Sequence, residues 1–101
     1  MMPVCDYGKP NYWLSVITLK EESKVKPLDI ILALEKENIE SRPVWKPMHL
    51  QPFYKEYKFV SNVEGKSVAE DLFNRGVCLP SDTKMSKEDM DRIIKIIKEL
   101  F

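Results

Sequence analysis

The sequence predicts an α+β fold: a two-layer sandwich in which helices pack on one face of a small, mainly antiparallel sheet of about three strands. Two observations lead to this prediction. Short runs rich in aromatic and β-branched residues alternate with segments whose apolar residues recur at helical spacing. The chain is also short, at 101 residues. That length suits one domain with one modest core and a radius of gyration of roughly 13 Å.

An irregular lead-in and a strand are expected at the start of the chain. Residues 1–11 are punctuated by glycine and proline, which predicts a loop or linker. The first residues also lack the basic start and the apolar stretch that are typical of a signal peptide. Residues 12–19 are almost continuously aromatic or β-branched, and this predicts a strand covered on at least one face.

A charged loop over residues 20–26 precedes a predicted helix over residues 27–38. Pro27 suits the first helical position, and Asn38 suits the stop. The apolar residues of this helix form one stripe with two flanking positions: Leu28, Ile31 and Leu32, flanked by Ile30 and Leu34. A short strand over residues 41–45 follows, and its proline is expected to keep it near an edge of the sheet.

The second half of the chain predicts an irregular helical turn, a helix, a strand and a last helix. The turn covers residues 50–57, and the helix runs from a Ser67–Glu70 capping box to Arg75, with Gly76 as its terminator. A short strand is predicted over residues 77–80. A second box at Ser86 and Asp89 opens the last helix, whose apolar face is assigned to the core: Met90, Ile93, Ile94, Ile97 and Leu100.

Composition limits the classes of function. Sixteen basic and sixteen acidic side chains leave no net charge, which argues against nucleic acid and anionic membranes as partners. No apolar stretch approaches the ~20 residues of a membrane span, so a cytoplasmic location is expected. Cys5 and Cys78 are too few for a disulfide framework, and Cys78 is expected to be a small buried residue. One histidine and two distant cysteines do not predict a metal site.

Residues 41–52 are the most informative stretch of the chain. They read Ser-Arg-Pro-Val-Trp-Lys-Pro-Met-His-Leu-Gln-Pro and resemble a run in the small domain of DegT/StrS-type nucleotide-sugar aminotransferases. Residues 11–14 resemble the opening strand of that domain, and residues 75–81 resemble its Gly-x-x-Leu-Pro-Ser ending. The three pieces occur in the family's order. The resemblance therefore implies that residues 12–101 form the C-terminal small domain of such an enzyme.

Enzymes of this family are fold-type-I pyridoxal phosphate proteins. The resemblance implies amino transfer, usually from glutamate, to the keto group of a nucleotide-linked sugar, in polysaccharide or glycan biosynthesis. The Schiff-base lysine, the acidic partner of the pyridine nitrogen and the phosphate cradle belong to a large N-terminal domain. This chain lacks that domain, so we expect it to bind no pyridoxal phosphate, to carry no catalytic residue and to be inactive alone. Family members are commonly dimers, which leaves a homo-oligomer open.

Three residues are assigned to substrate binding by the resemblance. His49 would face the sugar nucleotide, while Lys46 and Arg42 would offer cationic donors to phosphate or carboxylate. Other interpretations stay open at this point. His49 could be a plain turn residue, Lys46 a solvated charge, and Arg42 the partner of Glu40 or Asp82.

The two tryptophans and two other functional classes complete the sequence interpretation. Trp13 and Trp45 are expected to lie mainly in the core, because large aromatic side chains dominate burial. A stand-alone hydrolase is disfavoured, since the chain offers no set of nucleophile, base and orienting residue. The alternative to an aminotransferase domain is a non-catalytic module derived from it that binds a small ligand or a protein.

Overall fold

The computed structural model describes residues 4–101. The elements follow the predicted order: β1 (Ser15–Thr18), α1 (Pro27–Lys36), β2 (Arg42–Pro43), the 3-10 turns η1 (Met48–Leu50) and η2 (Pro52–Tyr54), α2 (Val68–Arg75), β3 (Gly76–Leu79) and α3 (Lys87–Lys98). Residues 4–11 of the predicted lead-in are irregular, whereas residues 1–3 lie outside the described part. The first strand starts three residues later than predicted, because Tyr12 adopts a left-handed φ of 50° that interrupts extended chain.

The three strands form one antiparallel sheet in the order β1-β3-β2. Ile17 of β1 and Pro43 of β2 both lie opposite Val77 of β3, so their side chains share one face of the sheet. Pro43 lies in an edge strand, where its missing N–H costs no ladder bond, as predicted. The fold is therefore the α+β arrangement that the sequence predicts.

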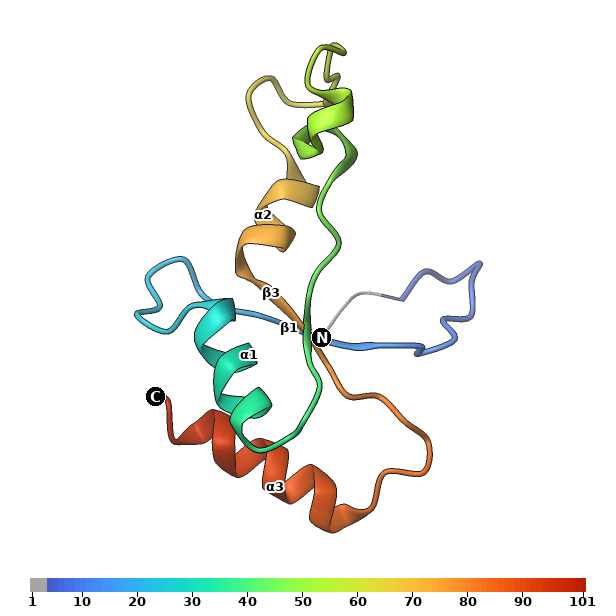
Figure 1. Cartoon of the computed structure of the whole chain (residues 1–101). Coiled ribbons are helices and arrows are strands. Elements are labelled where there is room, and N and C mark those ends of the chain that lie inside the picture. The colour runs from blue at the N-terminus through green and yellow to red at the C-terminus, as the bar shows by residue number, and fades with distance from the viewer. Residues whose placement is uncertain (1–3) are drawn as a thin grey trace.

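Helices α1 and α3 cover the Ile17 and Val77 face of the sheet and lie against each other (Figure 1). The fully buried side chains are Ile30 and Leu34 of α1 and Val77 of β3. Leu19 and Ile93 complete the buried cluster. The single small core thus lies between the sheet and these two helices.

Two predicted apolar stripes are rotated relative to the core. On α1, Leu28 and Leu32 are exposed, whereas Ile30 and Leu34 are the buried pair. On α3, Met90 and Ile94 are exposed, and the core-facing residues are Ile93, Ile96, Ile97 and Leu100. The sheet is narrow, with an edge strand of two residues. It can therefore cover only part of each broad apolar stripe, and the spacing alone does not say which part.

Two of the predicted helix ends form complete local motifs, at the end of α1 and at the start of α3. Asn38 has a left-handed φ of 57°, its amide donates to the Glu35 carbonyl at 2.9 Å, and the Ile39 amide donates to the Leu34 carbonyl at 3.0 Å. These two bonds make a Schellman motif at the end of α1. At the start of α3, Ser86 and Asp89 each accept a hydrogen bond from the other's amide, at 3.1 Å and 3.0 Å.

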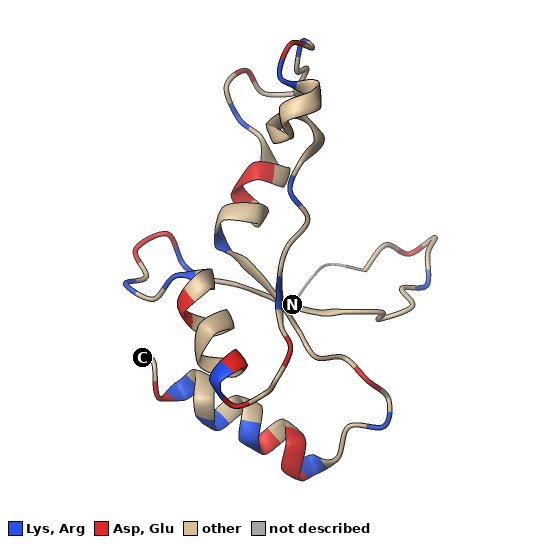
Figure 2. Ribbon diagram, viewed as in Figure 1, with Lys and Arg blue, Asp and Glu red and all other residues tan. Residues whose placement is uncertain are grey.

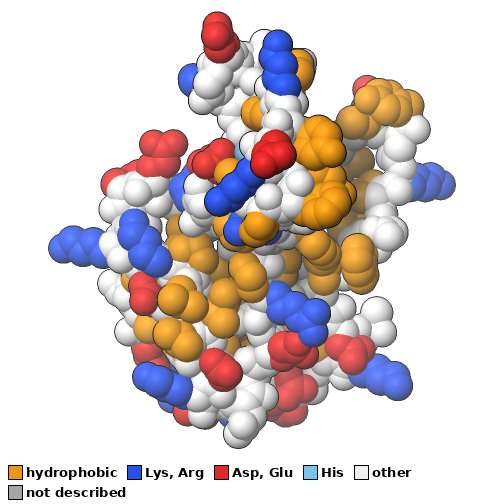
Figure 3. Space-filling model, turned by 45° about the horizontal axis from the view of Figure 1, so that its top comes forward, with side chains coloured by type: hydrophobic (Ala, Val, Ile, Leu, Met, Phe, Trp, Pro, Cys, Tyr) orange, Lys and Arg blue, Asp and Glu red, His pale blue; other side chains and the backbone are white. Residues whose placement is uncertain are grey.

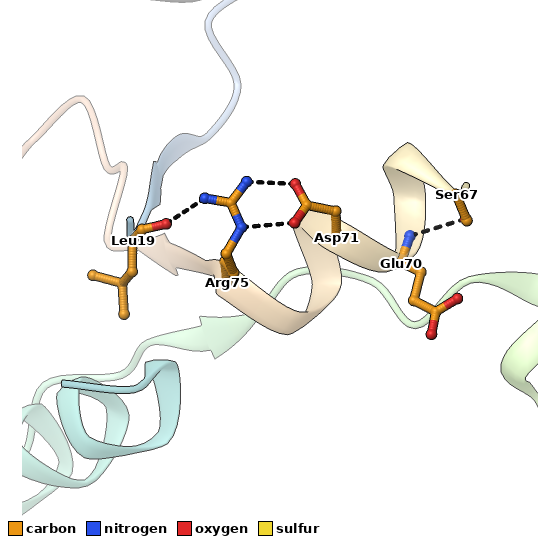
Figure 4. Close-up of polar contacts among 5 residues, drawn as sticks. All are labelled: Leu19, Ser67, Glu70, Asp71 and Arg75. Atoms are coloured by element: carbon orange, nitrogen blue, oxygen red, sulfur yellow. Dashed lines mark hydrogen bonds and ion pairs between the residues drawn. The ribbon is translucent and has the colours of Figure 1, made fainter. Parts of the chain in front are cut away.

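Arg75 joins α2 to the end of β1 (Figure 4). Its guanidinium holds both carboxylate oxygens of Asp71 and donates to the Leu19 carbonyl at 2.5 Å. The Arg75 carbonyl accepts in return from the Leu19 amide at 2.9 Å. The hydrogen bonds from Arg75 lower the pKa of Asp71 below its ordinary value, and the same contact raises the pKa of Arg75.

The molecule is more extended than the compact domain predicted from its length. Its radius of gyration is 15.9 Å, and its extents are 46 × 35 × 27 Å. Residues 48–75, hereafter the arm, project from the sheet with η1, η2 and α2 (Figure 1). The arm adds length without adding to the core. Charged residues of both signs are interspersed over the chain, including along α3 (Figure 2).

Candidate functional site

Helices α1 and α3 leave the second face of the sheet, hereafter the open face, uncovered. Val16 and Arg42 both lie opposite Cys78 in the register, so these three residues share this face. Cys78 is buried there as a free thiol, as predicted, and the exposed Cys5 is also free. A groove of about 1060 Å³ runs past this face and around the β2 edge, between the chain from residue 38 to 46 and the chain from 78 to 85.

Arg42 and Lys46 both line this groove. Arg42 Nε donates a hydrogen bond to Glu40 Oε1 at 2.7 Å. Of the two acidic partners considered from the sequence, Glu40 and Asp82, Arg42 therefore pairs with Glu40. Both side chains of the pair are about three-quarters exposed, at 76% and 74%, so the pair is weak and open to exchange for a ligand anion. Lys46 is exposed as well, and its carbonyl accepts from the Gln51 side chain at 3.3 Å.

The two tryptophans are not core residues, which corrects the prediction. Trp13 is 68% exposed and Trp45 is 62% exposed, with 5.9 Å between ring centroids and 42° between ring planes. Both line the groove. The prediction rested on the general tendency of large aromatic side chains to be buried, whereas both rings lie on a groove of the open side of the sheet.

His49 lies in the arm, on η1, and is not among the residues that line the groove. Its ring stacks on Phe59, with 3.9 Å between centroids and 27° between planes. Its Nε2 lies 3.4 Å from Glu70 Oε2, and its side chain is 17% exposed. The structure therefore places Arg42 and Lys46 on the same groove but puts His49 in a separate cluster beside the first turn of α2.

Phe59 and Glu70 contact His49 although the sequence did not predict either contact. Only half of the predicted Ser67–Glu70 capping box forms. Ser67 Oγ accepts a hydrogen bond from the Glu70 amide at 3.2 Å (Figure 4). The Glu70 carboxylate does not bond the Ser67 amide, and its Oε2 lies 3.4 Å from His49 Nε2. The one sequence signal for the contact between Glu70 and His49 was the presence of an acidic residue in the first turn of a short helix. Phe59 lies in an irregular segment and gave no periodic signal.

Exposed apolar side chains gather beside the arm and are bordered by charged residues (Figure 3). Large exposed apolar residues occur in the lead-in, at both tryptophans and along the first half of the arm: Tyr7, Tyr12, Trp13, Trp45, Met48, Phe53 and Tyr57. Exposed apolar surface on this scale is typical of a surface that another polypeptide covers.

The residues present do not fit a site for a Schiff-base cofactor. Every lysine of the chain is exposed, and the described residues include no buried charged side chain. A lysine that bonds covalently to pyridoxal phosphate needs a formed pocket with an acidic partner. Residues 4–101 also contain no group of three potential metal-ligating side chains. None of the helices described here is both long and apolar enough to cross a bilayer.

Comparison with known proteins gives a consistent family. The sequence model of the DegT/DnrJ/EryC1/StrS aminotransferase family matches residues 2–98. EpsN of Bacillus subtilis (strain 168), named as a pyridoxal phosphate-dependent aminotransferase, is 43% identical over 100 residues, covering 99% of this chain and 25% of EpsN. A GDP-perosamine synthase of Vibrio cholerae is 30% identical over 91 residues, covering 90% of this chain and 24% of that protein.

The fold matches solved structures of the same family. A DegT/DnrJ/EryC1/StrS aminotransferase from Brucella abortus superposes with a TM-score of 0.67 and 30% sequence identity. The superposition covers 86% of this chain and 22% of that one. The chain therefore spans about a quarter of the length of the relatives that it matches.

Proposed function

Because the chain belongs to the DegT/DnrJ/EryC1/StrS aminotransferase family, we propose that residues 12–101 are the C-terminal small domain of a sugar aminotransferase. Residues 1–11 would be the link to the large domain. The observation that carries the proposal is a family match over residues 2–98 in a chain that spans only about a quarter of its relatives. The remaining three-quarters of such an enzyme would contain the large N-terminal domain.

The reaction we propose for the complete enzyme is transfer of an amino group, usually from glutamate, to the keto group of a nucleotide-linked sugar. The name of the Vibrio cholerae relative supports a nucleotide sugar as substrate. The amino sugar would serve polysaccharide or glycan biosynthesis. Pyridoxal phosphate would be held by the large domain, because the exposed lysines of this chain do not fit that role.

The contribution of this chain to the enzyme is binding. Arg42 and Lys46 would attract the phosphates of the nucleotide from the groove, since a guanidinium and an ammonium suit phosphate oxygens. His49 would donate or accept a hydrogen bond on the sugar-nucleotide side. In this proposal the isolated chain is catalytically inactive. Two complete subunits would meet as a homo-oligomer.

The test joins this chain to the part of EpsN that it does not match. The chimera is assayed for amino transfer from glutamate to GDP-linked and UDP-linked keto sugars. We expect activity in the chimera, with none in the isolated chain. Arg42→Ala and Lys46→Ala should each raise the KM for the nucleotide sugar about tenfold with little change in kcat, the loss of one charge-assisted bond. Lys98→Ala, an exposed lysine of α3, is the matched control.

The same experiment separates the proposal from the alternative. If the chimera binds pyridoxal phosphate but does not transaminate, and the isolated chain binds nucleotide sugars saturably by calorimetry, the chain is a non-catalytic binding module. If Arg42→Ala, Lys46→Ala and Lys98→Ala chimeras all have the wild-type KM, the groove does not bind substrate.

A further inference from the structure

Glu70 does not follow the local role that its sequence context predicts. In a Ser-x-x-Glu capping box, the glutamate carboxylate accepts a hydrogen bond from the serine amide. Here Ser67 Oγ accepts the expected hydrogen bond from the Glu70 amide, but Glu70 Oε2 lies 3.4 Å from His49 Nε2. The carboxylate therefore serves a residue 21 positions away in the chain rather than its own helix end.

Two contacts from distant parts of the arm hold the His49 ring. Phe59 stacks against one face, at 3.9 Å between centroids, and Glu70 meets the ring edge at Nε2. His49 itself lies on a single turn of 3-10 helix, three residues long. Such a short element has poor hydrogen-bond geometry and does little to fix a side chain. The direction of the imidazole therefore depends on Phe59 and Glu70.

We propose that Glu70 is a positioning residue that sets which nitrogen of His49 meets the ligand. An ionised carboxylate can only accept, so the contact requires a proton on Nε2. The other nitrogen, Nδ1, is then the atom offered to a ligand: an acceptor in the neutral ring and a donor in the protonated ring. A carboxylate next to an imidazole commonly fixes the ring's tautomer and direction in this way. The inference rests on the proposed role of His49 in substrate binding.

The first experiment examines His49 in the 101-residue chain without any ligand. His49 is the one histidine of the sequence, so its imidazole resonances need no assignment by mutation. Long-range proton–nitrogen correlation on the neutral ring compares the wild type with Glu70→Ala and Glu70→Gln. In Glu70→Ala, the population protonated at Nδ1 should rise about threefold. The ring protons should also lose part of their upfield shift from Phe59.

The variants are matched so that a general loss of structure is recognised. Glu70→Gln keeps an acceptor oxygen at the same place and should restore most of the wild-type tautomer ratio. Glu64→Ala removes an exposed glutamate before the same helix and should leave the His49 spectrum unchanged. An identical tautomer ratio and identical ring shifts in wild type and Glu70→Ala would overturn the proposal.

The second experiment uses the chimera described above and separates this inference from the proposed function. If Glu70 acts through His49, Glu70→Ala should raise the KM for the nucleotide sugar about fivefold, with no further rise when added to His49→Ala. Additive effects would show that Glu70 acts independently and would overturn the inference. A shifted tautomer in the chain together with a normal KM in His49→Ala would confirm the contact and refute the ligand role of His49.

Discussion

Gly76 lies at the junction of α2 and β3, where two neighbours approach its backbone. Gly76 ends α2, as predicted, but its φ of −97° and ψ of 149° are open to any residue, so the helix does not end through a left-handed glycine. A Cβ at this position would overlap the Leu72 carbonyl oxygen and lie 2.5 Å from Val44 Cγ2. The glycine is required because the chain that leads into the arm passes directly over it.

Replacing Gly76 with alanine should therefore destabilise the fold by about 1–3 kcal/mol, as overpacking does where backbone cannot yield. Urea unfolding followed by circular dichroism measures the change. Gly8→Ala is the control, because a Cβ there meets no atom within 4 Å, and its effect should stay within about 0.5 kcal/mol. Equal stability of the Gly76→Ala and Gly8→Ala proteins would contradict the close approach.

The ion pair of Arg75 and Asp71 gives the chain a defined acid response. Because the pKa of Asp71 is lowered in the folded state, folding gains stability that is fully present above the ordinary value of 3.8. That stability is lost as the pH falls through the lower pKa of the folded state. Arg75 stays charged throughout this range, so the loss comes from the carboxylate alone.

The corresponding prediction compares wild type with Asp71→Asn across pH. The wild type should be more stable above pH 3.8, the ordinary pKa of Asp71, and the difference should shrink as the pH falls below it. Thermal unfolding at a series of pH values from 2 to 7 measures this difference. In an Arg75→Ala background the difference should vanish, since Arg75 is the main cause of the pKa shift. A difference that persists unchanged at the lowest pH would refute this account.

At the scale of elements, the structure separates what is encoded locally from what depends on neighbours. The end of α1 is local: its left-handed Asn38 and two carbonyl contacts need only the adjacent turn. Asn38→Ala should cost about 1 kcal/mol, because a left-handed backbone is unfavourable for alanine, whereas Asn38→Gly should be neutral or slightly stabilising. Chemical unfolding of both variants checks the order. Equal costs would argue that the left-handed turn does not form.

The order of elements and the sheet class were predictable because each strand and helix has its own composition and cap. The buried faces of α1 and α3 were not. On both helices an apolar stripe is broader than the sheet can cover, and packing chose Leu34 over Leu32 and Ile96 over Ile94. The start of β1 was also missed, because Tyr12 has high strand propensity but a left-handed backbone.

The candidate site was predictable only in part, for a related reason. In the sequence, the motif that resembles the family holds Arg42, Lys46 and His49 within eight residues. In the structure Arg42 of β2 and Lys46 just after it line the groove, whereas His49 lies in the arm and stacks on Phe59 from the chain further on. No spacing rule relates His49 to Phe59 or Glu70, because an irregular segment separates them.

At the scale of the whole molecule, the chain has a small core and a large uncovered surface. The arm extends the molecule, whose radius of gyration is 15.9 Å, while the core cluster of the described residues has only five buried side chains. The exposed tryptophan pair and the exposed apolar residues of the arm belong to this uncovered surface. Taken alone, such a surface favours contact between copies.

The isolated chain should therefore self-associate at high concentration. Light scattering across a concentration series should show a rise in average mass, driven by burial of apolar surface. The double variant Trp13→Ser and Trp45→Ser should shift the midpoint of this rise to about tenfold higher concentration. Leu28→Ser, a change at an exposed leucine of α1 that does not line the groove, should shift it much less. A strictly monomeric wild-type chain would contradict this prediction.

The exposed pair also gives the protein an optical property. Trp13 and Trp45 are its only tryptophans, and both are solvated at the edge of the same groove. Indole emission shifts to shorter wavelength when water is removed from the ring. Any polypeptide that covers the open face would therefore change the colour and yield of intrinsic fluorescence, so assembly can be followed in real time without an attached dye. The two tryptophans therefore act as intrinsic fluorescent probes of whether the open face is covered.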